Sequence, residues 1–308
     1  SGQLERLLRS GLKYCQKIQV LDAHAAGETK LLSILKIGPD LVFGRLWVDL
    51  GIGAVIEELG GRRQFGFSLE RAIYLTVLHR LFASGSDRAA ERWKESYSIP
   101  DAGALGLHQL YRAMVFLGEP IEGAGSLGSP RCMKDQIEEA LFDRRRDLFT
   151  AVGLVFFDTT SIYFEGNGGE SIGQYGHSKD HRPDRRQMIV GIAVDCEGRP
   201  LCCEMWPGNT TDAKTFPVVV ERMRQRFRVQ ELYVVADRGM VSAATLAAFE
   251  AMEPPVHYII GARMRRQKEV GEIVLKSRKR WVEVFPERQK SKDPAPLKIK
   301  EVEVEGRR

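Results

Sequence analysis

The stretch GLVFFDTTSIYF, residues 153–164, is rich in aromatic and β-branched residues and carries a single acidic residue, Asp158. This composition favours a β-strand, and the apolar residues on both sides of Asp158 predict a strand in the protein core. Burial of an unpaired carboxylate is costly. We therefore expect the carboxylate of Asp158 to have a partner that neutralises it. The rest of the sequence indicates what kind of partner this is.

From about residue 151 onward, segments with the apolar period of strands alternate with segments that have the period of helices. The predicted order is β-β-β-α-β-α-β, with helices that begin near Thr215 and after Ser242. This order is typical of the ribonuclease-H-like arrangement, in which the first and fourth strands lie side by side. The five strands are predicted at 153–164, 187–195, 200–208, 231–239 and 257–263.

Residues 1–150 have the apolar spacing of helices instead. Two predicted helices lie within 68–97, where Ser68 is a typical N-cap and Gly85 separates the pair. Such a pair occurs in helix-turn-helix DNA-binding proteins and also in plain helical bundles, and both interpretations stay open. A further helix at 134–149 leads into the second region.

The overall composition is that of a globular protein, with 43% hydrophobic and 28% charged residues. No apolar run reaches the roughly 18 residues of a membrane span, and no signal-peptide pattern opens the chain. The five cysteines lack the spacing of a metal site, which indicates a reducing compartment. We therefore expect a cytoplasmic protein without a membrane segment.

The net charge of +5 is unevenly distributed. Residues 263–308 hold 15 Lys and Arg against 8 Asp and Glu, a net of 15 − 8 = +7. The segment RMRRQK (263–268), which contains Arg265 and Arg266, has the charge that a nucleic-acid backbone attracts. A solvated basic surface with no partner is the alternative.

A second aspartate, Asp237, ends the fourth predicted strand, the one that lies beside the strand of Asp158 in this arrangement. Two carboxylates on neighbouring strands repel each other unless a cation lies between them. Mg²⁺ (or Mn²⁺) prefers oxygen ligands, and two such ions about 4 Å apart can activate a nucleophile and stabilise a leaving oxygen in phosphoryl transfer. The alternative is that both aspartates only end strands or cap turns.

Four segments resemble one known family. They are DTTSIYF (158–164), GHSKDHRPDRRQMIVGIAVD (176–195), PGNTTDAKTF (207–216) and VVADRGMVS (234–242). In this order they resemble the DDE transposases of bacterial insertion sequences, and most closely the IS1634 group of the IS4-like superfamily. The segments LWVDLGI (46–52) and GSDRAAERW (85–93) of the helical region are similar to that family as well.

The resemblance implies a metal-dependent enzyme that binds the terminal inverted repeats of its own mobile element, cleaves the DNA there and joins it to target DNA. Asp158 and Asp237 would be the first two acidic residues of the catalytic triad and would hold the metal. The third, a glutamate within a Tyr…Arg…Glu…Lys motif, is not found in this sequence. The resemblance also implies double-stranded DNA as partner and a homodimer on that DNA.

Basic residues near these motifs are candidate DNA contacts. The loop YGHSKDHRPD (175–184) contains Lys179 and Arg182, which could contact DNA phosphates. The alternative is a loop held by its own turns and salt bridges. Arg238, next to Asp237, could meet the phosphate that is cleaved.

The expected fold class is α+β, with three parts. An all-helical DNA-binding or dimerisation domain covers 1–150, a ribonuclease-H-like mixed sheet with helices covers 151–263, and the start of a β-rich insertion covers 264–308. Because the chain begins with Ser1 and stops within the alternating segment LKIKEVEVEGRR, we interpret it as a truncated and inactive fragment. Two other functions stay open: a hydrolytic nuclease of the same fold, and a catalytically dead DNA-binding remnant of a mobile element.

Overall fold

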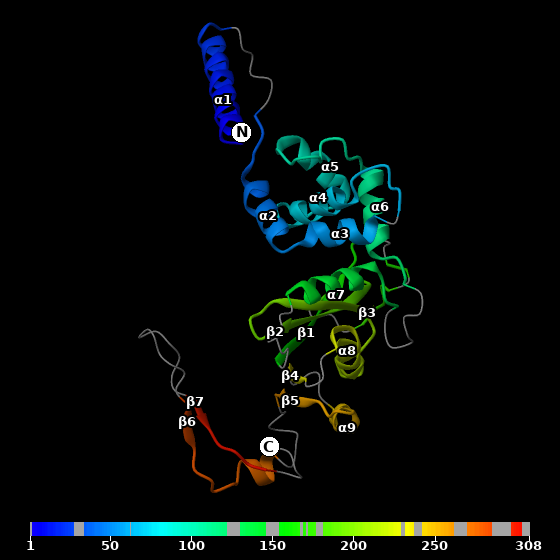
Figure 1. The fold of residues 1–308 in the computed structure, drawn as a ribbon. Helices are drawn as coiled ribbons and strands as arrows, with labels where there is room; N and C mark the ends of the chain where they lie inside the picture. The colour runs from blue at the N-terminus through cyan, green and yellow to red at the C-terminus, as the bar shows by residue number, and fades with distance from the viewer. Residues whose placement is uncertain are drawn as a thin grey trace. The chain divides into compact units, whose positions relative to one another are not determined.

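The computed structural model describes most of the chain, in two compact units, Ser1–Glu119 and Pro120–Arg308, which are treated separately (Figure 1). The described residues are 2–27, 34–61, 63–121, 130–145, 154–166, 169–170, 172–176, 181–228, 232–236, 242–261, 270–284 and 297–303.

The first unit is helical. Its α-helices are α1 (Gly2–Ala25), α2 (Gly38–Asp49), α3 (Ile52–Gly60), α4 (Leu69–Phe82), α5 (Asp87–Trp93) and α6 (Leu107–Leu117), and a short 3₁₀ helix, Lys94–Ser96, follows α5. The predicted cap at Ser68 is confirmed, because its side chain accepts a hydrogen bond from the backbone N–H of Arg71 at 3.2 Å. Ser86 caps α5 in the same way, through the N–H of Ala89 at 3.3 Å.

Helix α4 is the centre of this unit. Most of its residues from Leu69 to His79 are buried, and α2, α3, α5 and α6 all pack against it. Helix α5 has 7 residues, and its Ala90 is fully buried. Arg88 and Arg92 of the same helix are exposed, as a recognition helix in a DNA groove would require, so both interpretations of the pair stay open.

Polar contacts fix α2 against α4. The indole N–H of Trp47 donates to Glu70 Oε1 at 2.6 Å, and the hydroxyl of Tyr74 donates to Asp40 Oδ1 at 2.8 Å. The Arg71 guanidinium pairs with Glu70 and lies 4.4 Å from the centre of the Tyr74 ring. The polar groups of Trp47, Glu70 and Tyr74 thus have partners, as a stable interior requires.

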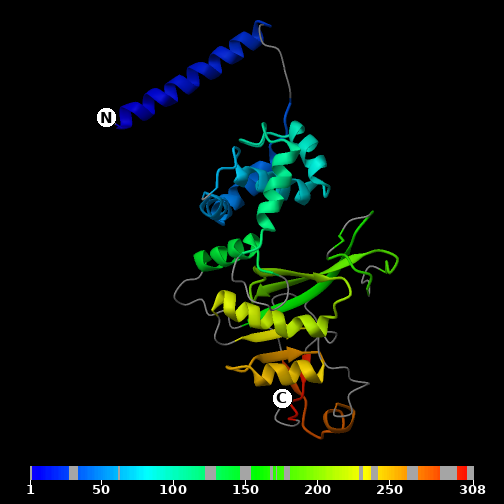
Figure 2. The same ribbon diagram turned by 90° about the vertical axis from the view of Figure 1, so that its right-hand side faces the viewer.

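The second unit is built on a five-stranded sheet of order β3-β2-β1-β4-β5. The strands are β1 (Leu154–Tyr163), β2 (Gln187–Asp195), β3 (Pro200–Pro207), β4 (Tyr233–Ala236) and β5 (His257–Ile260). Strands β1, β2 and β3 pair antiparallel, whereas β1, β4 and β5 pair parallel. Figure 2 shows β1 and β2 as the long strands of the sheet, which continue into the segment that joins them.

Helices and a small hairpin complete this unit. They are α7 (Met133–Arg145), α8 (Asp212–Phe227), α9 (Ala243–Ala251), a π-helix (Val270–Val274) and the antiparallel strands β6 (Val282–Val284) and β7 (Leu297–Ile299). Helix α8 begins three residues before the predicted start at Thr215 (215 − 212 = 3), so Pro217 lies inside it. The sequence-based start was wrong because it assumed that Pro217 must lie in the first turn, where its missing N–H removes no helical hydrogen bond.

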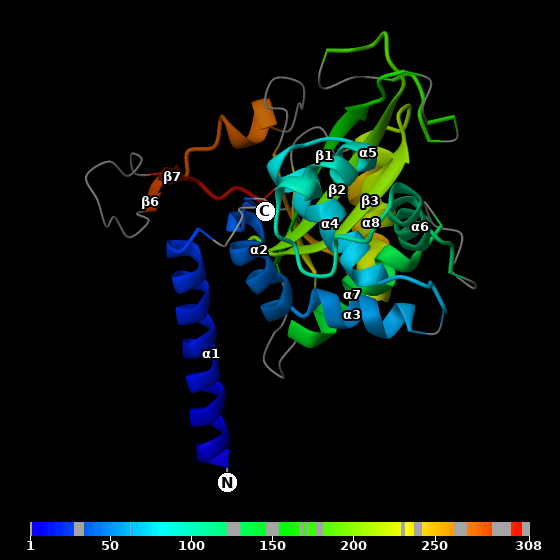
Figure 3. The same cartoon turned by 90° about the horizontal axis from the view of Figure 1, so that it is seen from above.

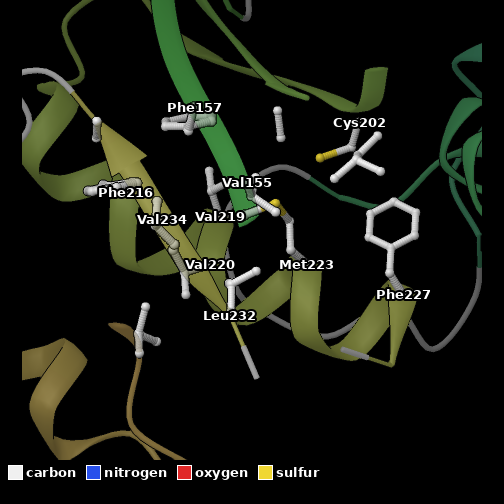
Figure 4. Close-up of a cluster of buried hydrophobic side chains, with 14 of the residues drawn as sticks. Val155, Phe157, Cys202, Phe216, Val219, Val220, Met223, Phe227, Leu232 and Val234 are labelled. Carbon is white, nitrogen blue, oxygen red and sulfur yellow. The ribbon is translucent and has the colours of Figure 1, made fainter. Parts of the chain in front are cut away.

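One face of the sheet forms the hydrophobic core with α8 and α9. Val155 and Phe157 of β1 point into the cluster that Val219, Val220 and Met223 of α8 complete (Figure 4). The ring of Phe157 stacks on that of Phe216 at 5.5 Å between centroids. Gly191 of β2 is needed here, because a Cβ would come within 2.7 Å of the Phe157 ring.

The other face of β1 is open, which corrects one prediction. Burial alternates along the strand, and Phe156 and Ile162 are 40% and 45% exposed. The run of apolar residues had predicted burial on both sides. Long apolar runs are typical of strands covered on both faces, but here the described residues cover only one.

A buried charge network attaches α7 to β3 and α8. The side chain of Arg226 of α8 is 2% exposed and pairs with Glu138 at 2.6 Å, with Glu139 at 2.8 Å and with Glu204 of β3 at 3.0 Å. Lys134 of α7 donates to the carbonyl of Cys203 at 2.6 Å. The helix predicted at 134–149 is thus part of the sheet-containing unit. None of the helices in the described part of the chain is long and apolar enough to cross a membrane.

Candidate active site on the open face of the sheet

Asp158 lies in the middle of β1 and faces the open side of the sheet. It pairs across the ladder with Ile192 of β2, and its side chain is exposed. Its Oδ1 accepts a hydrogen bond from the backbone N–H of Thr159 at 2.7 Å. The sequence predicted that the charge of Asp158 would lie in a buried strand. The side chain is instead exposed to solvent, so it needs no buried partner.

Apolar side chains lie near Asp158 on this face, with Thr160 between Asp158 and Ile162. Phe156 and Ile162 lie two and four residues away along β1, and Ile192, which is 45% exposed, lies opposite on β2. Tyr233 of β4 pairs with Leu154 and is 40% exposed. Asp158 is therefore an exposed carboxylate with apolar neighbours on this face of the sheet.

The parallel neighbour β4 brings its C-terminal end beside β1. Phe156 of β1 pairs with Val235 of β4, and β4 ends at Ala236. In the sequence, Asp158 follows Phe156 by the same number of positions as Asp237 follows Val235. Asp237 itself lies outside the described residues, as do Lys179, Arg238, Arg265 and Arg266.

Arg182 is the one predicted DNA contact that the structure describes. Its guanidinium forms two hydrogen bonds of 2.9 Å to Asp184 and lies 5.3 Å from the centre of the Tyr163 ring. The hydrogen bonds from Arg182 lower the pKa of Asp184 to about 2. The salt bridge between Arg182 and Asp184 agrees with the alternative of a loop held by its own ion pairs, and both interpretations of Arg182 remain.

The base of this loop is fixed by residues that the sequence analysis did not single out. Gln187 is fully buried at the start of β2, pairs through its backbone with Gln174 and donates from Nε2 to the carbonyl of Gly208 at 3.2 Å. A Cβ on Gly176 would lie 2.0 Å from Gly208 O, and a Cβ on Gly208 would lie 2.1 Å from Gln187 O. Gly176 and Gly208, which lie in two of the motif segments, are the sequence signal that could have pointed to this close contact.

The donor set partly fits a divalent metal. A carboxylate has lone pairs for about four contacts, so one backbone hydrogen bond leaves Asp158 with capacity for a cation. Within the described ranges, no three His, Cys, Asp or Glu side chains gather as a metal-binding group. Asp158 is thus one suitable oxygen ligand, and Asp237 is the residue whose sequence spacing fits the neighbouring strand.

Residues 153–302 match the family model described as "Transposase DDE domain". This part of the chain is therefore similar to transposase DDE domains, and it includes the five-stranded sheet and Asp158. Comparison with curated proteins gives no match.

Three solved structures are similar to this chain. A cryo-EM structure of a piggyBac transposase synaptic complex with hairpin DNA is 12% identical, with a TM-score of 0.41 over 75% of this chain and 52% of that chain. The Mos1 transposase paired-end complex with the left transposon end is 10% identical, with a TM-score of 0.26 over 62% and 59%. The Mos1 mariner paired-end complex with Mn is 14% identical, with a TM-score of 0.25 over 62% and 59%. The chain spans little more than half the length of these transposases.

Proposed function

We propose that this chain is the transposase of an insertion sequence, of the IS1634 group within the IS4-like superfamily, and that its sheet is ribonuclease-H-like. It cleaves DNA at the element's ends and joins it to target DNA by phosphoryl transfer. The observation that carries the proposal is the position of Asp158 on the open face of β1. Phe156 of β1 pairs with Val235 of its parallel neighbour β4, and these two residues are 235 − 156 = 79 positions apart in the sequence. Asp158 and Asp237 are separated by the same number, 237 − 158 = 79.

Mg²⁺ or Mn²⁺ is the proposed cofactor, with Asp158 and Asp237 as its ligands. A bound divalent ion neutralises charge on a phosphate and lowers the pKa of a bound water or hydroxyl. The protein's own contribution is rigidity: β1 is held between β2 and β4, and the stacked ring of Phe157 anchors its buried face. A fixed carboxylate needs little rearrangement to bind its ion.

DNA is the proposed partner, and a homodimer the proposed state on DNA. Lys179, Arg182 and Arg238 are proposed phosphate contacts near the sheet, and Arg265 and Arg266 are proposed contacts in the basic segment. To contact a phosphate, Arg182 would give up its two hydrogen bonds to Asp184 and form two to the phosphate, since both groups can accept a pair of hydrogen bonds. A cytoplasmic location belongs to the same proposal.

The first prediction is that the chain binds Mg²⁺ or Mn²⁺ through both aspartates. Calorimetric titration of the full chain should show binding that is lost in Asp158→Asn and in Asp237→Asn, because each change removes a charged oxygen ligand and keeps the side-chain volume. Asp184→Asn is the matched control, since it removes a carboxylate from the loop and should leave the binding unchanged. Equal binding in parent and both variants would show that the aspartates are structural.

Strand-joining assays separate the three functions. The sequence lacks a recognisable third acidic residue, so we expect the chain alone to cleave poorly. Cleavage of terminal repeats followed by joining to target DNA supports the transposase, whereas cleavage without joining supports a nuclease. DNA binding with neither reaction and no metal binding would support the DNA-binding remnant.

A further inference from the structure

Helix α1 has a seam of residues at the spacing of a coiled coil. Its 24 residues run without interruption (Figure 3). Along one side the residues alternate at intervals of three and four, which is the heptad repeat of a and d positions. The a positions are Leu4, Gly11, Ile18 and Ala25, and the d positions are Leu7, Tyr14 and Leu21.

This seam is open to solvent in the single chain. The exposed fractions of its five large side chains range from 48% for Ile18 to 73% for Leu7 and Tyr14. Helices in proteins derive most of their stability from packing of an apolar face rather than from helix propensity. The exposed seam is therefore suited to packing against a partner helix.

The middle of the seam shows which partner fits. Gly11 is among the least favourable residues in a helix interior, and a Cβ there would meet nothing within 4 Å in this chain. Among the residues that the structure describes, no contact therefore requires the glycine. One helical turn later comes Tyr14, the largest side chain of the seam. When two such helices pair, the space beside Gly11 of one helix can accept the Tyr14 ring of the other.

We propose that α1 pairs with α1 of a second copy of this chain as an antiparallel two-stranded coiled coil. In an antiparallel pair each a position faces a d position of the other helix. Leu4 then faces Leu21, Leu7 faces Ile18, and Gly11 faces Tyr14. Each contact occurs twice, because the two helices are related by a two-fold axis.

The parallel arrangement packs these residues less well. It would place Gly11 against Gly11 and Tyr14 against Tyr14, which leaves a void in one layer and crowds the next. The antiparallel arrangement combines a small and a large residue in both central layers and keeps their volume even. Association through α1 requires neither DNA nor metal, so the inference does not depend on the proposed function.

The first test measures association of the full chain by sedimentation equilibrium over a range of concentrations without DNA. The parent is expected to be a dimer. Leu7→Asp and Ile18→Asp should each weaken the dimer by about 100-fold or more, because each puts two carboxylates into apolar layers. Gln19→Asp, on the outer side of the same helix, is the control and should associate like the parent. A monomeric parent, or equal weakening in the control, would overturn the proposal.

A crosslinking test decides the orientation. In a chain whose exposed Cys15 and Cys196 are replaced by serine, we compare Leu7→Cys, Ile18→Cys and an equal mixture of the two. The antiparallel pair predicts a disulfide only in the mixture, since residues 7 and 7 of the two copies would be about 16 Å apart along the helix, too far for a bond. Efficient crosslinking of either variant alone would overturn the antiparallel arrangement.

Discussion

At the scale of single residues, the structure explains how an aspartate can stand in an apolar strand. Phe157 and Asp158 are neighbours in sequence, but they point to opposite faces of the sheet because strand side chains alternate. Phe157 contributes to the core, while Asp158 lies at the surface and is hydrated. The strand therefore holds the carboxylate in place without the cost of burying it.

Gly208 is a residue whose replacement should be costly. A Cβ there would lie 2.1 Å from Gln187 O and 2.5 Å from Gln174 O, both backbone atoms of the loop base. We expect Gly208→Ala to lower the free energy of unfolding of the sheet-containing unit by about 2 kcal/mol or more, as measured by urea denaturation. Gly103→Ala, where a Cβ meets nothing within 4 Å, is the control; an equal loss in both variants would contradict the steric argument.

His79 should make the helical unit sensitive to acid. Burial and the nearby charge of Arg80 lower the pKa of His79 from 6.5, against an opposing effect of Asp87. The unfolded state thus binds the proton more readily, so stability present above pH 6.5 is lost as the pH falls below that value, by at most about 1.4 kcal/mol per pH unit. Urea denaturation of the parent at pH 8 and pH 5 should show this loss.

Replacement of His79 tests the assignment. His79→Gln should remove part of the difference between pH 8 and pH 5. His108→Gln, at an exposed histidine of α6 in the same unit, should leave the difference as in the parent. A pH dependence that survives in His79→Gln unchanged would exclude His79 as its source.

At the scale of elements, ion pairs hold α7 in its place. Asp135 and Glu138 of α7 and Glu204 of β3 all pair with Arg226 of α8. Burial raises the pKa of Glu204, against the opposing effects of Arg222 and Arg226, while Lys134 and Arg226 hold the pKa of Asp135 below its ordinary value despite burial. Such a network specifies one position for the helix, because any shift would leave a buried charge without its partner.

Removal of Arg226 should therefore be strongly destabilising. Arg226→Met keeps much of the volume of the side chain but removes one buried cation from Glu138 and Glu204, which then keep only Lys134 and Arg222 as partners. We expect a loss of about 3–5 kcal/mol in the free energy of unfolding, seen as a lower urea midpoint. Gln225→Met, the exposed neighbour on α8, should change stability by less than about 0.5 kcal/mol. A loss below about 1 kcal/mol in Arg226→Met would show that the network contributes little.

At the scale of the whole molecule, charge is divided between the parts of the chain. Residues 263–308 carry a net +7, while residues 1–262 hold 46 − 15 = 31 basic and 41 − 8 = 33 acidic residues, a net of −2. Under the proposed function, attraction to the DNA backbone is concentrated in the C-terminal segment. Each phosphate that the protein neutralises releases counterions, so the affinity depends on salt.

Arg265→Ala/Arg266→Ala should therefore weaken DNA binding and its salt dependence together. If both side chains contact phosphates, the slope of log affinity against log salt concentration should fall by roughly 1.8, which is about 0.9 for each contact. Fluorescence anisotropy with duplex DNA at several salt concentrations measures it. Arg45→Ala/Arg92→Ala, in the helical unit, is a control of equal charge. An unchanged slope in the first double variant would place DNA elsewhere on the chain.

The sequence alone determined the features that depend on local patterns. Ser68 caps a helix because a hydroxyl before an apolar stripe satisfies a free backbone N–H. The period of the apolar residues located the five strands. Asp158 and Asp237 are as far apart in the sequence as Phe156 of β1 and its paired residue Val235 of β4.

Only the tertiary structure decided which faces of these elements are buried. It left Phe156 and Ile162 on the open face around Asp158, placed the network of Arg226 between three elements, and brought Gly208 against the backbone of Gln187. These features depend on contacts between residues distant in sequence. A local pattern specifies that a residue is apolar or charged, whereas its burial and its partner follow from how the chain packs as a whole.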